Sequence, residues 1–436
     1  MKKRIAHISD THLGARPREG VRPGVWGVEM RARLLENDFY ERFAEIFDRI
    51  AALDPPVDLV IHSGDLYDSP WDKNPQSPPP VALETALLVL KQFIQKTGIP
   101  VLLIEGNHGL YRNMEVSLLD YLRISLDGVS VATYVDFKRA LSEGRPLFFR
   151  YDELDVYCFP YIEPGLLESA GLVSDFNDWV TIHQKPSRRD AVSVAVAHGM
   201  DIDKTLHHSI FSNKYDYVAL GHDHHQHQYR EDAWYAGSPE RWRFDESRHE
   251  KGFLLVEIEK GQPPVVTPQK IELERPVLTD QIVLRPDMTV ETAIEVIDEW
   301  FESKGLKTAW NPRTAARVSL ALTDDSPQVR GNELNIALEG LRSRVFTEGS
   351  GYNISQFVWS LKRSDTEHYA SAFPEIESEY LIADPEADFK EFLSSKQLDS
   401  GYDPEVLTRI AVGALKFAVT RPDEKLTLEG LEEERE

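Results

Sequence analysis

The stretch Tyr217-Val218-Ala219-Leu220-Gly221-His222-Asp223-His224 decides how the rest of the chain is interpreted. Its first four residues form an apolar run that predicts a buried β-strand, and two histidines follow where this strand ends. Because residues i and i+2 of an extended chain point the same way, His222 and His224 can reach toward one site. Alone this is a weak signal, since many pairs of histidines separated by one residue are surface residues.

Four other apolar runs, which predict strands over 4–9, 57–62, 100–104 and 191–197, also end in residues that can bind a metal ion. The residues that follow them are Asp10, His12, Asp65, Asn107, His108 and His198. In open α/β sheets, ligands collect beyond the carboxyl ends of the strands. Any one of these histidines is more often structural than catalytic, but five such strand ends together are very improbable by chance.

The donor types indicate the metal chemistry. Carboxylate, imidazole and amide oxygen donors without cysteine suit manganese, iron or zinc. There are too many donors for one ion, whereas two ions that share one carboxylate would use nearly all of them. Two cations about 3.5–4 Å apart activate water and hold a phosphate ester for in-line attack. The sequence therefore predicts a two-metal site for phosphate esters.

The hydrophobic periodicity predicts a layered α/β domain around a mixed sheet, followed by a smaller α/β domain. In the first part, helices are expected over 34–53, 81–97 and 116–124, and further strands over 155–159 and 252–258. In the second part, strands 281–284, 317–322 and 354–361 alternate with helices 290–303 and 333–345. Two more helices are expected over 387–395 and 404–420.

Length, charge and cysteine content limit the classes of protein. A chain of 436 residues with 41% hydrophobic residues can form two or three domains. Its net charge of −24 argues against simple DNA coating, because such proteins carry a basic face. Half of that excess lies in residues 364–436, with 19 acidic against 7 basic residues, so a DNA substrate for the first part is not excluded.

The compartment is predicted from two further features. No apolar run approaches the roughly 18 residues that span a bilayer, so we expect no membrane association. The only cysteine, Cys158, fits a reducing cytoplasm and lies in an apolar run, where a small buried hydrophobe is the simpler interpretation.

Taken in order, the motifs DTH (10–12), GDLYD (64–68), GNH (106–108), HG (198–199) and GHDH (221–224) resemble the calcineurin-like metallophosphoesterase superfamily. The segment YAGSPER (235–241), with Phe244, Glu246, Lys251, Gly252 and Phe253, is similar to the SbcD-type nucleases of DNA double-strand-break repair. The resemblance covers residues 1 to 260 strongly and the remainder by pattern only.

The resemblance implies an α/β fold: a four-layer metallophosphoesterase core with a smaller α/β capping domain and C-terminal helices. It places the nuclease domain at 1–275 and the capping domain at 276–363. Residues 364–436 are then a linker, ATPase-binding helices and an acidic tail.

The resemblance also implies the role of each site residue. One divalent metal ion, usually manganese, would be bound by Asp10, His12, Asp65 and His224. The second would be bound by Asp65 as the bridging ligand together with Asn107, His198 and His222. His108 would assist the leaving group rather than bind metal. The implied activity is that of a manganese-dependent DNA exonuclease or endonuclease, and the residues do not decide between the two.

One departure from the family pattern concerns the residue after GNH, which is usually acidic and here is Gly109. A carboxylate there could orient His108, so its absence puts catalytic efficiency in question. Our hypothesis is that Asp68 supplies the missing orientation. Candidate DNA contacts are Arg16, Arg18, Arg112, Arg241 and Arg243, although exposed arginines commonly serve only solubility.

The implied partners are DNA, a coiled-coil ATPase of the SbcC type and a second copy of the chain. The ATPase would bind the C-terminal helices, about 387–420, whose apolar stripe could alternatively fold back on its own domain. The homodimer would form through the helices that begin near Val81 and Val116. The expected location is the cytoplasm, at the nucleoid.

Two other functions stay open. The chain could be a phosphodiesterase for small molecules, against which the YAGSPER segment, the cap and the C-terminal helices count. It could also be a metal-bearing scaffold of the ATPase complex whose catalysis Gly109 has weakened. Fold alone does not separate these functions.

Overall fold

The computed structural model describes residues 2–17, 19–27, 32–68, 78–109, 116–162, 171, 176–199, 211, 215–285, 287–324 and 331–363. The chain divides into two compact units, of which one comprises 1–282, 287–320 and 327–359 and the other 283–286, 321–326 and 360–436. The helices expected over 387–395 and 404–420 lie outside the described residues. The domain borders expected near 275 and 363 stay predictions.

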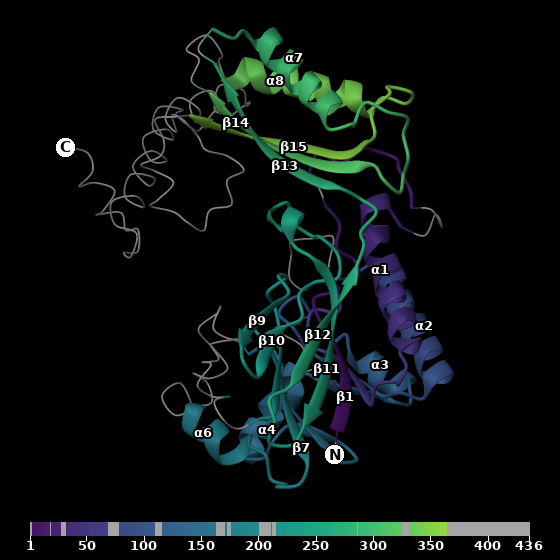
Figure 1. The fold of residues 1–436 in the computed structure, drawn as a ribbon, viewed down its shortest axis with the longest axis vertical. Helices are drawn as coiled ribbons and strands as arrows, with labels where there is room; N and C mark the ends of the chain where they lie inside the picture. Colours follow the sequence, from purple (N-terminus) through teal and green to yellow (C-terminus); the bar gives the residue numbers. More distant parts are fainter. Residues whose placement is uncertain are drawn as a thin grey trace, which may run out of the picture. The chain divides into compact units, whose positions relative to one another are not determined.

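The first sheet has the strand order β12-β11-β1-β2-β3-β4. Figure 1 labels its strands β12, β11 and β1. Its strands are β1 (Lys2–Ile8), β2 (Leu59–His62), β3 (Val101–Ile104), β4 (Val129–Ala132), β11 (Lys251–Glu259) and β12 (Val265–Ile271). The four strands β1 to β4 are parallel, and β11 and β12 run antiparallel to their neighbours. The carboxyl ends of β1, β2 and β3 therefore lie at one edge of the sheet.

The second sheet has the order β5-β6-β7-β8-β10-β9. Its strands are β5 (Phe148–Tyr151), β6 (Leu154–Phe159), β7 (Val192–His198), β8 (Tyr217–Gly221), β9 (His227–Arg230) and β10 (Ala233–Tyr235). Strands β6, β7, β8 and β10 are parallel, and the register pairs His198 with Gly221. His198, which ends β7, and His222, which follows β8, are thus brought close together.

The two sheets share a core because their central strands are buried on both faces. In β2, Leu59 and Ile61 belong to the apolar cluster that includes the strands of the second sheet, whereas Val60 belongs to the cluster with the helices. The same alternation holds in β3 for Leu102 and Leu103. Burial on both faces explains why these strands are continuous apolar runs rather than alternating ones.

Helices pack against both sheets of this pair. They are α1 (Leu34–Ala51), α2 (Pro80–Thr97), α3 (Asp120–Ser125), α4 (Tyr134–Glu143) and α6 (Phe176–His183). Figure 1 shows α1 and α2 side by side along the first sheet. The predicted apolar face of α1 is buried, and each such large side chain contributes about 1.5–3 kcal/mol. This layered α/β arrangement confirms the predicted fold class.

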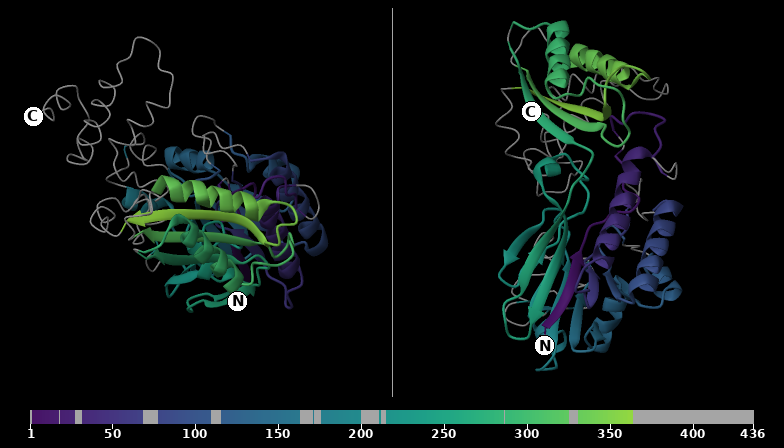
Figure 2. Two further views of the ribbon diagram at one scale, coloured as in Figure 1. Left: turned by 90° about the horizontal axis from the view of Figure 1, so that it is seen from above. Right: turned by 45° about the vertical axis from the view of Figure 1, so that its right-hand side comes forward.

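Residues 277–363 form a third sheet with the order β13-β14-β15. Its elements are β13 (Val277–Leu284), α7 (Val290–Ser303), β14 (Ala316–Asp324), α8 (Gly331–Phe346) and β15 (Ile354–Arg363), in the predicted alternation. Figure 2 shows both helices on one face of this sheet. Helix α7 begins where predicted because Thr289 and Thr292 form a capping box.

Some predicted bounds were wrong and several short elements were not predicted. The helix expected over 116–124 begins only at Asp120, because the Asp120 carboxylate accepts a hydrogen bond from the backbone of Ser117 at 2.8 Å and forms a turn there. The unpredicted elements are β4, β5, β9, β12, α4, α6 and the 3₁₀ helix η2 (Asp245–Arg248). Among the described helices, none is long and apolar enough to cross a membrane.

Candidate metal centre

The predicted ligand residues meet where five parallel strands of the two sheets end. Strands β1, β2 and β3 bring in Asp10, His12, Asp65, Asn107 and His108, and strands β7 and β8 bring in His198, His222 and His224. The carboxylates and His12 are buried, with 0% exposure for Asp10 and His12. The distances between strand ends on facing sheets, which the sequence could not provide, are short enough for shared ligands.

The backbone at these strand ends is strained. Five described residues other than glycine have positive φ, and four of them belong to the site: Asp10 (50°), His12 (45°), Asp65 (54°) and His222 (93°). Such conformations cost about 1–3 kcal/mol each and concentrate at functional sites. Two backbone hydrogen bonds between the loops hold them, from Asp10 to Gly64 and from His12 to Asp65, both 3.0 Å.

Two glycines allow the loops to approach this closely. A Cβ on Gly64, which has φ of 110°, would lie 2.1 Å from Nδ1 of His198. A Cβ on Gly106 would lie 2.1 Å from a carboxylate oxygen of Asp65. The glycines of the GDLYD and GNH motifs are therefore required by the side chains that pack against them.

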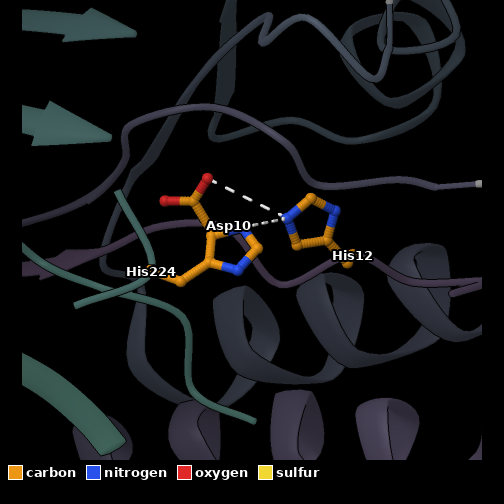
Figure 3. Close-up of side chains that lie close together, drawn as sticks. All are labelled: Asp10, His12 and His224. Atoms are coloured by element: carbon orange, nitrogen blue, oxygen red, sulfur yellow. Dashed lines mark hydrogen bonds and ion pairs between the residues drawn. The ribbon is translucent and has the colours of Figure 1, made fainter. Parts of the chain in front are cut away.

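We call Asp10, His12 and His224 the first ligand cluster (Figure 3). The Nε2 atoms of His12 and His224 are 3.0 Å apart. Their Nδ1 atoms face carboxylates, at 3.2 Å from Asp68 for His12 and 2.9 Å from Glu246 for His224. With both Nδ1 atoms protonated, two lone pairs point at one place, an arrangement that a cation satisfies.

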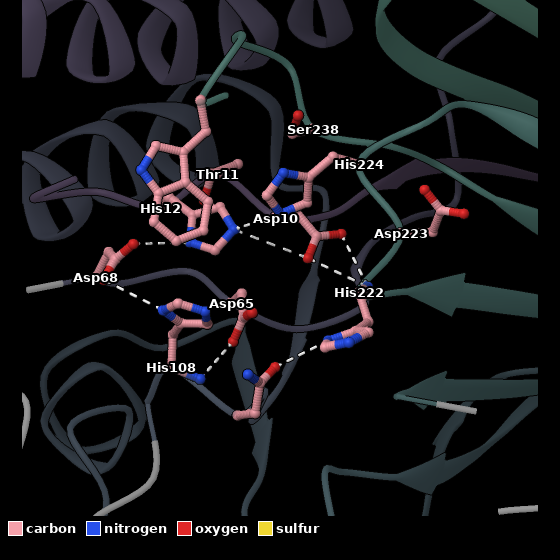
Figure 4. Close-up of polar contacts among 12 residues, drawn as sticks. Asp10, Thr11, His12, Asp65, Asp68, His108, His222, Asp223, His224 and Ser238 are labelled. Carbon is pink, nitrogen blue, oxygen red and sulfur yellow. Dashed lines mark hydrogen bonds and ion pairs between the residues drawn. The ribbon is translucent and has the colours of Figure 1, made fainter. Parts of the chain in front are cut away.

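We call Asp65, Asn107, His198 and His222 the second ligand cluster. Figure 4 labels two of its members, Asp65 and His222. Oδ1 of Asn107 lies 2.9 Å from Nε2 of His198 and 3.0 Å from Nδ1 of His222. Nδ1 of His198 donates to the carbonyl of Ser63 at 2.9 Å, which leaves Nε2 free to bind. Neutral imidazole, carboxylate and amide oxygen together fit a divalent ion of the manganese, iron or zinc type.

Asp65 lies between the two clusters. Its Oδ2 is 3.2 Å from Nε2 of His198, and its Oδ1 accepts the backbone N–H of His108 at 2.9 Å. Asp65, His12 and His108 also satisfy the distances of a ligand group. Burial raises the pKa of Asp65, but the neighbouring histidines, His198 first, outweigh burial and lower the pKa well below its usual value. A carboxylate here can face two ions at once.

His108 and Asp68 form a pair beside the ligand clusters. Nδ1 of His108 is 3.2 Å from Oδ1 of Asp68 (Figure 4). Burial lowers the pKa of His108, but the carboxylates of Asp65 and Asp68 outweigh burial and raise the pKa to about 9. Asp68 therefore contacts two site histidines, His12 through one oxygen and His108 through the other.

A buried lysine supports His224 from behind. The side chain of Lys251, at the start of β11, is 0% exposed and donates to Glu246 at 2.6 Å, Ser238 at 2.7 Å and the carbonyl of His224 at 3.0 Å. The second oxygen of Glu246 holds Nδ1 of His224. Glu246 and Lys251 belong to the sequence motif that extends from YAGSPER. Their role in orienting His224 follows only from the fold.

The candidate DNA-contacting arginines are not equivalent. Arg16 lies 3.8 Å from the carboxylate of Glu36, and Arg241 donates to the carbonyl of His249 at 3.4 Å. Arg243 is exposed and lies over the ring of Trp242, 5.3 Å from its centroid. Arg18 and Arg112 lie outside the described residues. Of the described three, Arg243 is the most accessible.

The fold and the two ligand clusters define a class of protein. The family model for calcineurin-like phosphoesterases matches residues 3–226, just over half of the chain, and the chain belongs to this family. It is similar to the DNA double-strand break repair protein Mre11 of Saccharolobus solfataricus, with 28% identity over 288 residues, which cover 61% of this chain and 65% of that relative.

Two further relatives carry the same name. The protein of Sulfurisphaera tokodaii is 24% identical over 285 residues, 63% of each chain. That of Methanococcus maripaludis is 36% identical over 111 residues, 26% of this chain and 24% of the relative. The chain thus matches less than two thirds of the length of each relative. These similarities confirm the resemblance predicted from the motifs.

Proposed function

We propose that the chain is the nuclease subunit of a DNA double-strand-break repair complex and hydrolyses DNA phosphodiester bonds with two manganese ions. The observation that carries this proposal is the pair of ligand clusters on either side of Asp65, whose donors suit two divalent ions. Membership in the phosphoesterase family supports the reaction. The similarity to proteins named for double-strand-break repair supports DNA as the substrate.

The roles of the residues follow from their positions. Asp10, His12 and His224 would hold one ion, Asn107, His198 and His222 the other, and Asp65 would bridge both. When bound, the ions supply an activated water and neutralise charge on the phosphate. His108 would donate a proton or a hydrogen bond to the departing oxygen. Asp68, 3.2 Å away, would keep the ring of His108 in the required orientation.

We propose two protein partners in addition to DNA. A coiled-coil ATPase of the SbcC type would bind the C-terminal helices, about 387–420, and the complex would act in the cytoplasm at the nucleoid. A second copy would pack through α2 and α3. A contact there would cover the exposed apolar side chains of Leu88 on α2 and Ile124 on α3, which have 38% and 83% exposure.

A second candidate, the catalytically weakened scaffold, has one observation in its favour, the glycine at position 109. The two candidates differ in one measurable property. We expect the isolated chain to cleave end-labelled single- and double-stranded DNA in manganese and to lose this activity in His108→Ala while still binding two ions. Two bound ions without cleavage, with or without the ATPase, would contradict the nuclease and support the scaffold.

A further inference from the structure

Trp242 lies against three histidines of the site. Its ring centroid is 4.7 Å from that of His12, 5.2 Å from that of His108 and 5.5 Å from that of His224. A structural tryptophan normally packs among apolar side chains, whereas these three rings belong to candidate ligands and to the candidate proton donor. The indole therefore borders the space beside the ligand clusters, where a phosphate of the proposed substrate would lie.

The indole is only half-buried, and it keeps an edge for a further contact. On one side, the exposed guanidinium of Arg243 lies 5.3 Å from the ring centroid. An aromatic face beside a cation is the combination with which proteins bind single nucleotides of a strand.

The backbone that carries Trp242 is held from the third sheet. Arg317 of β14 is 5% exposed and donates to the carbonyl of Arg241 at 2.7 Å and to that of Trp242 at 2.9 Å. Burial lowers the pKa of Arg317 to about 10, although carboxylates, Glu240 first, raise it. The guanidinium still carries its charge at neutral pH, and the two carbonyl oxygens accept hydrogen bonds from two of its N–H groups.

Gln356 of β15 completes this support. Its side-chain oxygen accepts from Nε of Arg317 at 2.7 Å, and its amide donates to the carbonyl of Glu19 at 3.0 Å. Glu19 belongs to the loop that follows His12, and the next residue of that loop, Gly20, accepts the backbone N–H of Phe357 at 2.8 Å. One buried pair, Arg317 and Gln356, thus holds the segments that flank two sides of the site.

We propose that Trp242 is a substrate-positioning residue, and that Arg317 and Gln356 keep its indole against the site. The proposal rests on the proposed nuclease function, because the group that the indole contacts would be the nucleotide beside the scissile phosphate. Contact between an aromatic ring and a base changes affinity by about 5- to 150-fold. The third sheet then sets part of the substrate specificity through the backbone of Trp242.

The position of Trp242 can be tested without nuclease activity. Bound Co²⁺ quenches the fluorescence of a nearby tryptophan, so titration of the metal-free protein with Co²⁺ should quench part of the emission. We expect this part to disappear in Trp242→Phe and to shrink in Arg317→Gln and in Gln356→Leu. Arg313→Gln, an exposed arginine of the same region, is the matched control and should quench as the wild type does. Unchanged quenching in Trp242→Phe overturns the proposal.

Kinetics test the contact with substrate. Trp242→Ala should raise KM for DNA by about 5- to 150-fold, and Trp242→Phe by much less. Hydrolysis of bis(p-nitrophenyl) phosphate, which has no nucleotide, should fall by a smaller factor than cleavage of DNA, with two ions still bound. Adding Arg317→Gln to Trp242→Ala should cause little further loss, because both changes act on the same contact.

The outcomes separate this proposal from the one on which it rests. Equal loss on both substrates, together with loss of bound metal, would mean that Trp242 only supports the histidines and would overturn its positioning role. Wild-type protein that binds two ions but cleaves no DNA would contradict the nuclease function. In that case Co²⁺ quenching still decides whether Arg317 and Gln356 hold the indole beside the ions.

Discussion

Two parts of the site, which we call the floor and the wall, differ in how the sequence positions their residues. We define the floor as the strand-end residues of both ligand clusters, and the wall as residues 235–251 with Arg317. Each floor residue follows a parallel strand within a few positions, so the register of the sheets places it. The wall segment is held by two buried charged side chains, Lys251 within the segment and Arg317 from the third sheet.

Because of this difference, we expect substitutions in the floor and in the wall to have different effects. The floor combines short turns and strained backbone, and its side chains act directly on ions, so a single substitution there should remove function with little effect on neighbours. The wall depends on Lys251 and Arg317, whose charges are buried and need all of their partners. Substitutions in the wall should therefore reduce function by degrees and lower stability as well.

The largest effect is expected at the centre of the floor. Asp65→Asn removes the charge that faces both clusters, so we expect cleavage to fall by at least about a thousandfold and fewer than two ions to remain bound. Metal content by mass spectrometry and a DNA cleavage assay measure this. Asp127→Asn, an exposed carboxylate in a turn, is the control and should match the wild type. Two tightly bound ions in Asp65→Asn would show that this carboxylate does not bridge.

His108 should come next, because it acts on the reaction but not on the ions. His108→Ala should lower kcat by about a hundredfold or more while both ions stay bound. Asp68→Ala should lower kcat as well, since Asp68 contacts Nδ1 of His108 at 3.2 Å. Unchanged cleavage in Asp68→Ala would remove this carboxylate from the mechanism.

In the wall, Glu246→Gln should weaken metal binding without abolishing it. The neutral side chain no longer orients His224, and loss of such an outer partner costs about 10- to 100-fold in metal affinity. Buried Lys251 also loses its charged partner, so the free energy of unfolding should fall by up to about 3–5 kcal/mol. Competition with a metal chelator and urea unfolding measure the two effects. Loss of stability with unchanged metal affinity would make Glu246 structural only.

The contrast between floor and wall also explains what the sequence could predict. Asp10, Asp65 and His198 were predictable because an apolar run followed by a ligand residue is a local pattern, and parallel strands bring such ends together. Glu246 and Trp242 stand in a segment without periodicity, and their roles depend on Lys251 and Arg317. No local pattern pairs Arg317 with residues 75 positions earlier, so this contact needed the fold.

A smaller, pH-dependent effect is expected beneath the floor. His7 is fully buried, and its ring nitrogens are hydrogen-bonded to Tyr217 of the second sheet at 2.8 Å and to Ser63, which follows β2, at 2.9 Å. Burial, aided by His62, lowers the pKa of His7 to about 3. A lowered pKa means that the stability from neutral His7 is complete above about pH 6.5 and is lost as pH falls toward 3.

This predicts a difference between wild type and His7→Gln. Between pH 7.5 and 5.5, the wild type should lose about 1.4 kcal/mol more free energy of unfolding than the variant, because the unfolded chain alone takes up the proton of His7. Urea unfolding at the two pH values measures the difference. Equal losses in both proteins would show that His7 becomes charged without cost in the fold.

The smallest effect is expected at Gly109, the residue on which the scaffold interpretation is based. A Cβ there would meet nothing closer than Cγ of Glu105, at 3.7 Å, so Gly109→Asp should fold normally. The added side chain would point toward Glu105, whose buried carboxylate has a pKa that burial raises to about 7. It would not reach the contact that Asp68 already makes with His108.

We therefore expect Gly109→Asp to change kcat on DNA by less than about threefold, and not to restore activity to Asp68→Ala. Steady-state cleavage by the single and double variants, with Asp127→Asn again as the control, measures this. A tenfold or larger gain in Gly109→Asp would mean that the glycine had weakened the site, which is what the scaffold function requires. An unchanged rate would support Asp68, rather than the residue at position 109, as the residue that orients His108.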